Sequence, residues 1–562
     1  MKIPYGLSNF KKVITEGFVY VDKTAYIAAL ETDGQYHFLL RPRRFGKSLF
    51  ISALEYYYDV KHQADFAAIF SQLHIGQHPT PTRSSYQVLF MEFSGIATDS
   101  AESVERSFTH KVDVALKSTL ERYAYPAAAI ASVDKSYSSY EKMEAFFSAT
   151  RGQKIFLLID EYDHFANSML ADDPKLFQSV MGKGGFVRSF YETIKAATQR
   201  GTVDRLFITG VTPLMLDSMT SGFNIARNLS LHRDFNAAMG FTQTEVAALI
   251  QPLIETCQLD TNVLLDDMAH WYNGYRFHPK ATETVYNANM VLYFLDNFRL
   301  EECAYPEQML DENIASDYRK IMALFGIGDR EANYQVLDEL VTTGTVKAQQ
   351  QRKFELDKNF SRDDFISLLA YMGFVTISGS TLTQTVFAIP NHVIRELYFH
   401  YFKVELERRN QISIPNQSLT QAIELLALQD DIQPLLNEMQ RVLQVLSNRD
   451  FMKMDEKHIK TLLLTLLYHS PVYFIQSERE MNHRYPDILL LERSPYAVPH
   501  QHLIELKYAK KSEGVKGWEA KREEGITQVQ GYLSVPEIAA LPKLSAWVVL
   551  TDSEQLDVVK VQ

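Results

Sequence analysis

Short apolar runs alternate with helical patterns through the first 240 residues of the chain. The runs span residues 38–40, 86–94, 155–159 and 205–208, and residues 101–150 have the apolar spacing of a crossover helix. Buried runs separated by helices are typical of a mostly parallel sheet with helices on both faces. The pattern therefore predicts an α/β fold for this part of the chain.

The middle of the chain is predicted to be mainly helical. Residues 241–300 favour a helical lid that opens with a capping box, in which Thr242 caps the helix and Glu245 is the reciprocal acid. Residues 374–383 form a hairpin-like passage after helices, which suggests a winged-helix-like module that contacts DNA or a protein. Residues 401–450 are helical and polar, which indicates a connector.

The last part of the chain returns to a mixed pattern. A helix from residue 454 to 468 is followed by apolar strands and by a further helix. The predicted strand segments are 472–480, 484–491, 502–508 and 546–550, and the second helix contains 526–532. This order predicts a second, smaller α/β domain.

Composition sets the class of protein. With 562 residues the chain should form two to four domains, and 46% hydrophobic and 22% charged residues are ordinary for globular proteins. The net charge of −12 argues against a generally basic nucleic-acid coat protein but leaves room for a local basic groove. Two cysteines cannot form a disulfide framework, and no signal peptide or membrane span is evident, so a cytoplasmic location is expected.

A basic loop follows the first apolar run and leads into a helix. Its residues are Arg43, Arg44, Phe45, Gly46, Lys47, Ser48 and Leu49. Backbone N–H groups at such a junction form a positive cradle for the phosphates of ATP. Lys47 would add a charge at the terminal phosphates, and Ser48 a hydroxyl ligand for Mg²⁺. The phosphate-loop pattern has glycine where Arg41 stands, so a surface turn entering a helix is the alternative.

Polar residues end two of the later apolar runs. Asp160 would hold Mg²⁺, directly or through water, and Glu161 would polarise the attacking water, although acids at strand ends also serve as caps. Thr209 stands where such ATPases keep a residue that senses the γ-phosphate; the alternative is a hydroxyl satisfied at a strand end. The phosphate loop and the acid pair support each other, because each motif predicts the other.

Two aromatic segments leave a structural and a functional interpretation open. Residues 18–24 would form an edge strand and a helix cap, or would contact the base of the nucleotide. Trp271, Tyr272 and Tyr275 surround Asn273-Gly274 and would close a turn, or would contact nucleotide or a partner.

A second group of polar residues lies in the last domain. Glu505 and Lys507 share one face of a strand, and Asp487 begins its neighbour, so the two carboxylates can converge. Two oxygen ligands of this kind suit Mg²⁺, for which Mn²⁺ could substitute. Lys507 would orient the attacking water or stabilise the transition state. Glu456 is a candidate outer acid, and Gln528 a candidate orienting amide.

An ordinary solvent-facing hairpin is the alternative for this group, because Glu-x-Lys is common cross-face pairing. Basic residues beside the group would guide a phosphate backbone or form a solvated face. They are Lys510, Lys511, Lys516, Lys521 and Arg522.

The chain resembles a known family. The segments that carry the resemblance over about the first 290 residues are FVYVDKT, LLRPRRFGKSLF, IFLLIDEYD, FITGVTPLMLDSMTSGFNIARNLSL, MGFTQTEV, HWYNGYRF and VYNAN. They resemble the bacterial AAA-ATPase-like family, which often carries a PD-(D/E)XK nuclease at its C-terminus. The resemblance implies nucleotide binding more firmly than fast hydrolysis, and it implies that Arg41 is a family trait.

The order of acid helix, Asp strand, Glu-x-Lys strand and Gln helix resembles the PD-(D/E)XK nuclease superfamily. Glu478 and Glu480 match the family's entry to the Asp strand. Where the family has Gly-Arg-x-Asp, this chain has Arg484-Tyr485-Pro486-Asp487, so the Gly-Arg pair is lost and the acid is kept.

Together these features predict four parts. They are a P-loop ATPase-like domain (1–240), a helical lid with a winged-helix-like region (241–400), a helical connector (401–449) and a restriction-endonuclease-like α/β domain (450–562). The expected function is an ATP-binding regulator fused to a Mg²⁺-dependent nuclease, with DNA a better candidate than RNA, no membrane partner, and a homo-oligomer as an option.

Two other functions stay open. The first is a non-catalytic, ATP-switched platform that binds nucleic acid or protein. The second is an ATPase motor, which needs an arginine finger for which Arg43 and Arg44 are candidates.

Overall fold

The computed structural model describes residues 1–561 except 183–184, 216–224, 312–322, 355–359, 448–454 and 478–485. The chain forms two compact units, each made of segments that are not contiguous in sequence. The first unit comprises Met1–Asn297, Leu310–Val336 and Thr345–His392, and the second comprises Phe298–Met309, Leu337–Gly344 and Val393–Gln562.

Five parallel strands form the main sheet of the first unit, in the order β2-β3-β4-β1-β5. The strands are β1 Tyr36–Leu40, β2 Gln87–Glu92, β3 Ile155–Asp160, β4 Val203–Gly210 and β5 Arg227–Asn228. β3 is buried along its whole length, as its uninterrupted apolar run predicts. β4 lies between β1 and β3, so the carboxyl ends of these three strands share one edge of the sheet.

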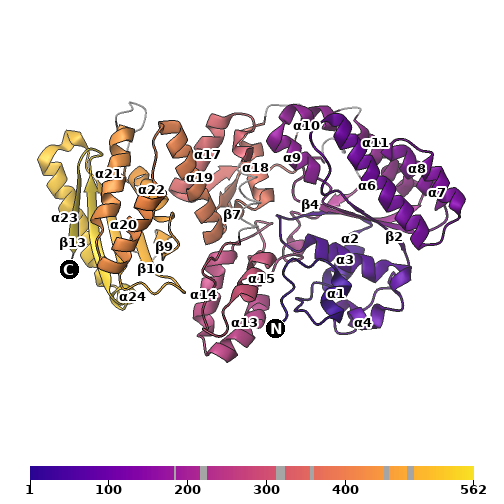
Figure 1. The fold of residues 1–562 in the computed structure, drawn as a ribbon, viewed down its shortest axis with the longest axis horizontal. Helices are drawn as coiled ribbons and strands as arrows, with labels where there is room; N and C mark the ends of the chain where they lie inside the picture. Colours follow the sequence, from indigo (N-terminus) through magenta and orange to yellow (C-terminus); the bar gives the residue numbers. More distant parts are fainter. Residues whose placement is uncertain are drawn as a thin grey trace. The chain divides into compact units, whose positions relative to one another are not determined.

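Helices cover both faces of this sheet (Figure 1). α1 (Phe10–Thr15), α2 (Ala25–Asp33) and α3 (Lys47–Tyr58) lie on one side, and α6 (Ala101–Arg122), α8 (Ser139–Ala149) and α11 (Phe186–Gln199) on the other. On the α3 side, Phe156 and Leu158 of β3 join Leu54 and Tyr57 of α3 in one buried cluster. Alternate residues of the strand thus face this helix layer.

The predicted lid consists of α13 (Gln243–Cys257), α14 (Thr261–Tyr272) and α15 (Ala288–Asn297). The capping box is confirmed: the Thr242 hydroxyl accepts from the Glu245 backbone, and the Glu245 carboxylate accepts from the Thr242 backbone. Trp271, Tyr272 and Tyr275 are all buried, which favours the aromatic cluster over a direct ligand contact.

A three-stranded antiparallel sheet follows the lid, in the order β6-β8-β7. Its strands are β6 Thr345–Ala348, β7 Thr376–Ser380 and β8 Thr385–Ala388, and α18 (Arg362–Met372) lies between β6 and β7 in the chain. The predicted hairpin-like passage, residues 374–383, contains β7 and the turn after it, and its partner β8 lies just beyond the predicted range. The middle region is winged-helix-like. β6 was not predicted, because it is only four residues long and pairs with a strand far along the chain.

A mixed five-stranded sheet with the order β13-β12-β11-β10-β9 forms the second unit's core. The strands are β9 Tyr473–Ser477, β10 Ile488–Glu492, β11 Gln501–Tyr508, β12 Leu544–Thr551 and β13 Leu556–Val561. β11 and β12 are parallel, and the other pairs are antiparallel. α22 (Glu456–Leu467) and α23 (Gly514–Leu533) pack on β11. The expected restriction-endonuclease-like α/β domain agrees with this arrangement.

The connector region is helical, as expected. Its helices are α19 His392–Asn410, α20 Asn416–Gln429 and α21 Gln433–Ser447.

Among the described residues, no helix is both long and apolar enough to cross a membrane. Cys257 and Cys303 are half-buried, and neither is a free thiol. The number of cysteines in the sequence therefore does not by itself indicate the cellular compartment.

Candidate functional site

The loop between β1 and α3 turns through two left-handed backbone positions. Arg44 has φ +69° and Gly46 has φ +91°, and Gly46 is the N-cap of α3. Such a turn at a helix N-terminus directs backbone N–H groups into one concavity, which suits an anion. The first turn of α3 carries Lys47 and Ser48, so both side chains begin at this concavity.

The loop is anchored by residues of the lid. The Asn287 side-chain amide donates to Arg43 O at 3.2 Å, and the Asn289 backbone N–H donates to Arg44 O at 3.2 Å. Phe45 is buried, and its ring packs edge-on against Tyr275 with 5.0 Å between centroids. The loop conformation therefore depends on the lid as well as on its own sequence.

Arg41 is a structural residue of this loop. It is 1% exposed, and its guanidinium donates to Leu40 O and Ser230 O at 2.8 Å and to Phe235 O at 2.5 Å. The same group stacks on Phe277 at 3.9 Å from the ring centroid. Burial lowers the pKa of Arg41 to about 9. The arginine at the usual glycine position therefore stabilises the loop through buried hydrogen bonds and ring stacking.

Lys47 and Ser48 face the acids at the end of β3. The Lys47 ammonium is buried and donates to Arg41 O at 3.1 Å and Pro42 O at 2.9 Å. Burial lowers the pKa of Lys47, and the charges of Asp160 and Glu161 oppose that shift. Burial raises the pKa of Asp160, while a hydrogen bond from the Ser48 hydroxyl lowers it. The structure thus brings Lys47, Ser48, Asp160 and Glu161 together.

The segment after β3 is pinned to the end of β4. Glu161 has a left-handed φ of +50°, and its backbone N–H donates to Asp160 Oδ1 at 2.9 Å. Asp163 is buried and accepts from the Val211 N–H at 3.0 Å and from the Thr212 N–H at 2.6 Å. This network fixes the turn that carries Glu161.

The structure places Thr209 inside the sheet. Its side chain is fully buried, and its hydroxyl donates to Leu39 O at 2.6 Å, inside the pair of strands β1 and β4. Thr209 is not among the residues that line the cavity in front of the loop. The alternative, a threonine satisfied at a strand end, is the one the structure supports.

A cavity of about 390 Å³ opens in front of the loop. All seven predicted loop residues and Glu161 line it, whereas Asp160 and Thr209 do not. Val19, Tyr20 and Val21 also line it, with apolar residues such as Phe241 and Leu249. The lining thus combines polar groups suited to phosphates with apolar side chains suited to a base, and the segment 18–24 contributes to it.

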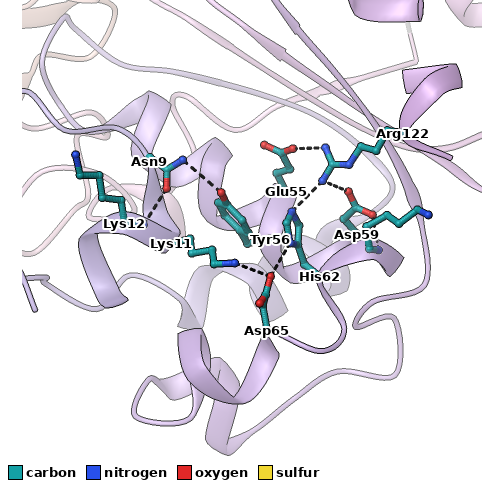
Figure 2. Close-up of polar contacts among 10 residues, drawn as sticks. Asn9, Lys11, Lys12, Glu55, Tyr56, Asp59, His62, Asp65 and Arg122 are labelled. Carbon is teal, nitrogen blue, oxygen red and sulfur yellow. Dashed lines mark hydrogen bonds and ion pairs between the residues drawn. The ribbon is translucent and has the colours of Figure 1, made fainter. Parts of the chain in front are cut away.

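A separate cluster of polar side chains in the first unit has the residue types of a metal site, but the guanidinium of Arg122 lies among them (Figure 2). Glu55, Asp59 and His62 place ligand atoms within 4.8 Å of one another. Arg122 from α6 lies 2.7 Å from Glu55 Oε1, 2.5 Å from Asp59 Oδ2 and 2.9 Å from His62 Nε2. Burial opposes the charged form, but Glu55 and Asp59 raise the pKa of Arg122. The cluster ties the end of α3 to α6.

In the second unit, strand register brings the predicted carboxylates together. Ile488 pairs with Ile504 across β10 and β11, so Asp487 and Glu505 occupy the next opposed positions on the same face. Asp487 Oδ2 accepts from the Leu506 N–H at 2.9 Å. The two acids therefore converge at the edge of the hairpin.

Lys507 links the acids of this group. Its ammonium donates to Glu505 Oε1 at 2.8 Å and lies 3.8 Å from Glu456 Oε1, which projects from the first turn of α22. Burial lowers the pKa of Lys507, but the contacts with Glu505 and Glu456 outweigh it and raise the pKa. Burial also raises the pKa of Glu456, although Lys507 opposes the shift.

Glu505 has the burial and hydrogen bonding of a metal ligand. It is 3% exposed, and its Oε2 atom is buried without a hydrogen-bond partner among the described residues. Burial and the charge of Asp487 raise the pKa of Glu505 to about 7. A buried carboxylate oxygen without a donor is costly unless a cation or proton occupies it. The residues present therefore fit a hard divalent cation held by Asp487 and Glu505.

Gln528 is not brought into this group. It is exposed on α23, and no contact joins it to the other four residues in the part of the chain that the structure describes. Gly525, one turn earlier, is the residue of α23 that faces the site: a Cβ there would lie 3.2 Å from Lys507 Cγ.

Some predicted motif residues lie outside the described residues. They are Ser221 to Asn224, Glu478, Glu480, Arg484 and Tyr485.

Two functional features escaped sequence reasoning. The first is the anchoring of the phosphate loop by Asn287 and Asn289, for which the only signal was the motif VYNAN. The second is Lys460, whose ammonium lies 3.8 Å from Asp487 Oδ1. Its position four residues after Glu456 places it on the same helix face, which is a signal that could have found it.

Comparison with known proteins finds a family match over each of the two parts of the chain that contain these sites. Residues 4–220 match the family described as predicted AAA-ATPase, and residues 454–561 match the PD-(D/E)XK nuclease superfamily. An uncharacterized protein from the vnfD 5′ region of Azotobacter chroococcum (mcd 1) is 29% identical over 288 residues, covering 51% of this chain and 50% of that protein. The chain thus spans about half the length of this curated relative.

Among solved structures, a Walker-type ATPase of Pyrococcus abyssi aligns with a TM-score of 0.38 and 9% identity. The alignment covers 67% of this chain and 94% of that protein, and a similarity at this level carries no functional assignment.

Proposed function

We propose that this chain, in which an AAA-ATPase-like domain is joined to a domain of the PD-(D/E)XK nuclease superfamily, is an ATP-dependent regulator of its own Mg²⁺-dependent nuclease. The observation that carries the nuclease half is the convergence of Asp487, Glu505 and Lys507 around the unpartnered Glu505 Oε2. The bond cleaved is a phosphodiester of nucleic acid, with DNA the first candidate and RNA the second.

In this proposal Asp487 and Glu505 hold the divalent cation, Mg²⁺ or Mn²⁺. When bound, the ion supplies a Lewis acid that acidifies water and neutralises charge on the scissile phosphate. Lys507 keeps Glu505 in place and donates to the charge that develops in the transition state. Glu456 acts as an outer acid that holds Lys507 from the opposite side.

At the other site, the loop residues Arg43 to Leu49 bind the phosphates of ATP, and residues 19–21 contact its base. Lys47 would exchange its present bonds with Arg41 O and Pro42 O for bonds with the terminal phosphates. Ser48 and Asp160 would hold Mg²⁺, and Glu161 would orient the attacking water for hydrolysis.

The test is cleavage by the full-length chain and by the double variant Asp487→Asn, Glu505→Gln. With Mg²⁺ or Mn²⁺, the wild type should cut nucleic acid, and the double variant should be slower by about a thousandfold or more because it loses the cation. Binding of the same nucleic acid, measured by fluorescence anisotropy, should persist in the variant.

The competing proposal is the non-catalytic platform, and the exposed position of Gln528 favours it, because the predicted orienting amide does not reach the acids. Absence of cleavage by the wild type on single- and double-stranded DNA and RNA, with either metal, together with retained binding, would establish the platform instead.

The setting of this activity is also a proposal. A protein that binds ATP and nucleic acid fits the cytoplasm, and defence against invading DNA or DNA processing fits a switchable nuclease. A homo-oligomer would allow Arg43 or Arg44 of one copy to reach the nucleotide of another.

A further inference from the structure

The turn after β3 adds a histidine to the lining of the nucleotide cavity. His164 is the first residue of α9 (His164–Asp172), and its backbone N–H donates to Glu161 O at 3.1 Å. Both residues line the cavity, together with the loop residues Lys47 and Ser48. His164 therefore lines the same cavity as the residues proposed to bind the phosphates and to orient the attacking water.

The backbone position of His164 is fixed by the residue before it. Asp163 is 1% exposed, and its carboxylate accepts from the backbone N–H groups of Val211 and Thr212 and from the Thr212 hydroxyl. The approach is so close that a Cβ at Gly210 would lie 2.1 Å from Asp163 Oδ1. The first turn of α9 is thereby held against the end of β4, and the imidazole starts from a defined place.

The imidazole of His164 makes no hydrogen bond to any of the residues that the structure describes. Its Nδ1 atom is enclosed by protein and has no partner there, so Nε2 is the nitrogen left to meet a ligand. Asn167, one turn later, also lines the cavity, but it donates to Asp163 Oδ2 and accepts from the Thr212 hydroxyl, both at 2.6 Å. Both ends of the Asn167 amide are thus in use, whereas the imidazole is available.

The environment of Lys47 indicates which part of a nucleotide His164 would meet. Burial lowers the pKa of Lys47, and the charges of Asp160, Glu161 and Asp163 oppose that shift. These carboxylates act on the ammonium because they are near it, since charge interactions weaken with distance. Lys47 is proposed to bind the terminal phosphates, so His164, which follows Asp163, is a candidate to contact the same phosphates.

An ATP-dependent regulator needs a group that distinguishes ATP from ADP, and these nucleotides differ only in the γ-phosphate. Thr209, the residue predicted to sense that phosphate, has its hydroxyl bonded to Leu39 O and does not line the cavity. An imidazole at the cavity surface can take this role, because it can donate an N–H to a phosphate oxygen.

We propose that His164 recognises the γ-phosphate: its Nε2–H donates to a γ-phosphate oxygen when ATP occupies the cavity, and ADP offers no such acceptor. The inference rests on the proposed nucleotide-binding function and adds a specificity-determining residue to it. Because a hydrogen bond to an anion is stronger than one between neutral groups, this contact should contribute about tenfold to the affinity for ATP.

The experiment measures the binding of two nucleotides to the full-length chain by isothermal titration calorimetry with Mg²⁺ present. ADP is compared with adenylyl imidodiphosphate, which keeps the γ-phosphate and resists hydrolysis. In His164→Ala the affinity for adenylyl imidodiphosphate should fall about tenfold, whereas the affinity for ADP should stay within about twofold of the wild-type value.

Two amide substitutions test which nitrogen makes the contact. The side-chain amide nitrogen of glutamine can take the place of Nε2, and that of asparagine the place of Nδ1. His164→Gln should therefore bind adenylyl imidodiphosphate within about threefold of the wild-type affinity, and His164→Asn should behave like His164→Ala.

The matched control is His110→Ala, which removes an exposed histidine from α6 and should change neither affinity. Melting temperatures identify variants that fail to fold. If His164→Ala is one of them, the difference between His164→Gln and His164→Asn decides the outcome.

An equal loss of affinity for both nucleotides in His164→Ala, or no loss for either, would overturn the inference and leave the nucleotide site intact. A wild-type chain that binds neither nucleotide would refute the proposed nucleotide binding, and this inference with it.

Discussion

At the residue scale, the departure from the phosphate-loop pattern is a substitution with a function of its own. Arg41 donates to three backbone carbonyls and stacks on Phe277. Where the pattern has a conformationally free glycine, this chain therefore has a buried side chain that stabilises the loop. Its pKa of about 9 leaves the guanidinium charged at neutral pH. The side chain points away from the cavity, which it does not line.

Restoring the usual residue should therefore harm the protein. Arg41→Gly should lower the free energy of unfolding of the first unit by about 2–4 kcal/mol, because three buried carbonyls lose their donor. Differential scanning fluorimetry measures the stability, and titration with a fluorescent ATP analogue measures binding. Arg43→Ala, at a residue that lines the cavity, is the control, and should weaken nucleotide binding with little loss of stability. An Arg41→Gly protein of wild-type stability and tighter ATP binding would contradict this account.

Sequence reasoning at this scale succeeded where local rules determine the geometry. Strand alternation and one hairpin register are enough to bring Asp487 and Glu505 together, and the Gly-Lys-Ser motif is enough to place Lys47 and Ser48. It could not place the Thr209 hydroxyl, because whether a hydroxyl faces a cavity or a neighbouring carbonyl depends on the strand beside it. It could not place the Gln528 side chain either, because the rotation of α23 is set by its packing on β11 and β12.

At the element scale, the second unit is held together by a histidine that must stay neutral. His502 on β11 is fully buried; its Nδ1 accepts from the Trp547 indole at 3.2 Å, and its Nε2 lies 3.2 Å from Leu426 O. Burial lowers its pKa to about 4, against the charge of Asp430, whose Oδ1 lies 3.7 Å from Nδ1. Lys560 and His500 lower it further. The neutral ring thus links α20, β11 and β12.

This arrangement predicts a loss of stability in mild acid. The folded pKa is about 4 and the unfolded value about 6.5, so the unfolded chain binds more protons between these values. The contribution of His502 is complete above pH 6.5 and declines as the pH falls toward 4, by about 3 kcal/mol at most.

Urea unfolding followed by Trp547 fluorescence at pH 7 and pH 5 measures this effect, with Trp271 and Trp518 replaced by Phe. His502→Gln should be less stable at pH 7 but should lose less stability between the two pH values. His110→Gln, which removes an exposed histidine from α6 of the first unit, should keep the wild-type pH dependence. Equal pH dependence in His502→Gln and wild type would assign the acid sensitivity to other groups.

The sequence predicts most of the helices and strands, but it does not predict which of them lie next to each other in the fold. Apolar runs located β1 to β4 and β9 to β12, and Thr242 and Glu245 located the start of α13, whereas β13 was not predicted. The insertion of β4 between β1 and β3 comes from pairing over long sequence separation, which local patterns do not encode. β5 and β6 were missed because strands of two and four residues leave no periodic signal.

At the scale of the whole molecule, the sequence suggested four consecutive parts, whereas the structure groups the chain into two units with interleaved segments. Sequence reasoning places boundaries where composition shifts, so it assumes that a domain is continuous. The four-part division stays a prediction, and the matched ranges 4–220 and 454–561 lie within its first and last parts.

An AAA-ATPase-like domain and a nuclease-superfamily domain on one chain predict coupling between nucleotide binding and the proposed cleavage. Lys47→Ala should bind ATP about 10- to 100-fold more weakly, because the buried ammonium no longer meets the phosphates, and ATP should then cease to alter the rate of DNA cleavage. Cleavage rates of the full-length chain, with and without ATP, measure this. Lys154→Ala, at an exposed lysine before β3, should respond to ATP like the wild type. A Lys47→Ala protein that keeps the wild-type ATP response would show that the two activities are independent.

The interleaving of segments has a consequence for how such a gene can be inherited. The second unit takes in residues 298–309 and 337–344, while 310–336 and 345–392 belong to the first. A single recombination breakpoint anywhere between codons 298 and 392 would leave one product without part of its fold, and the other with a surplus piece. Exchange of the second unit between related genes should therefore be rare, so that both units descend together as one inherited block.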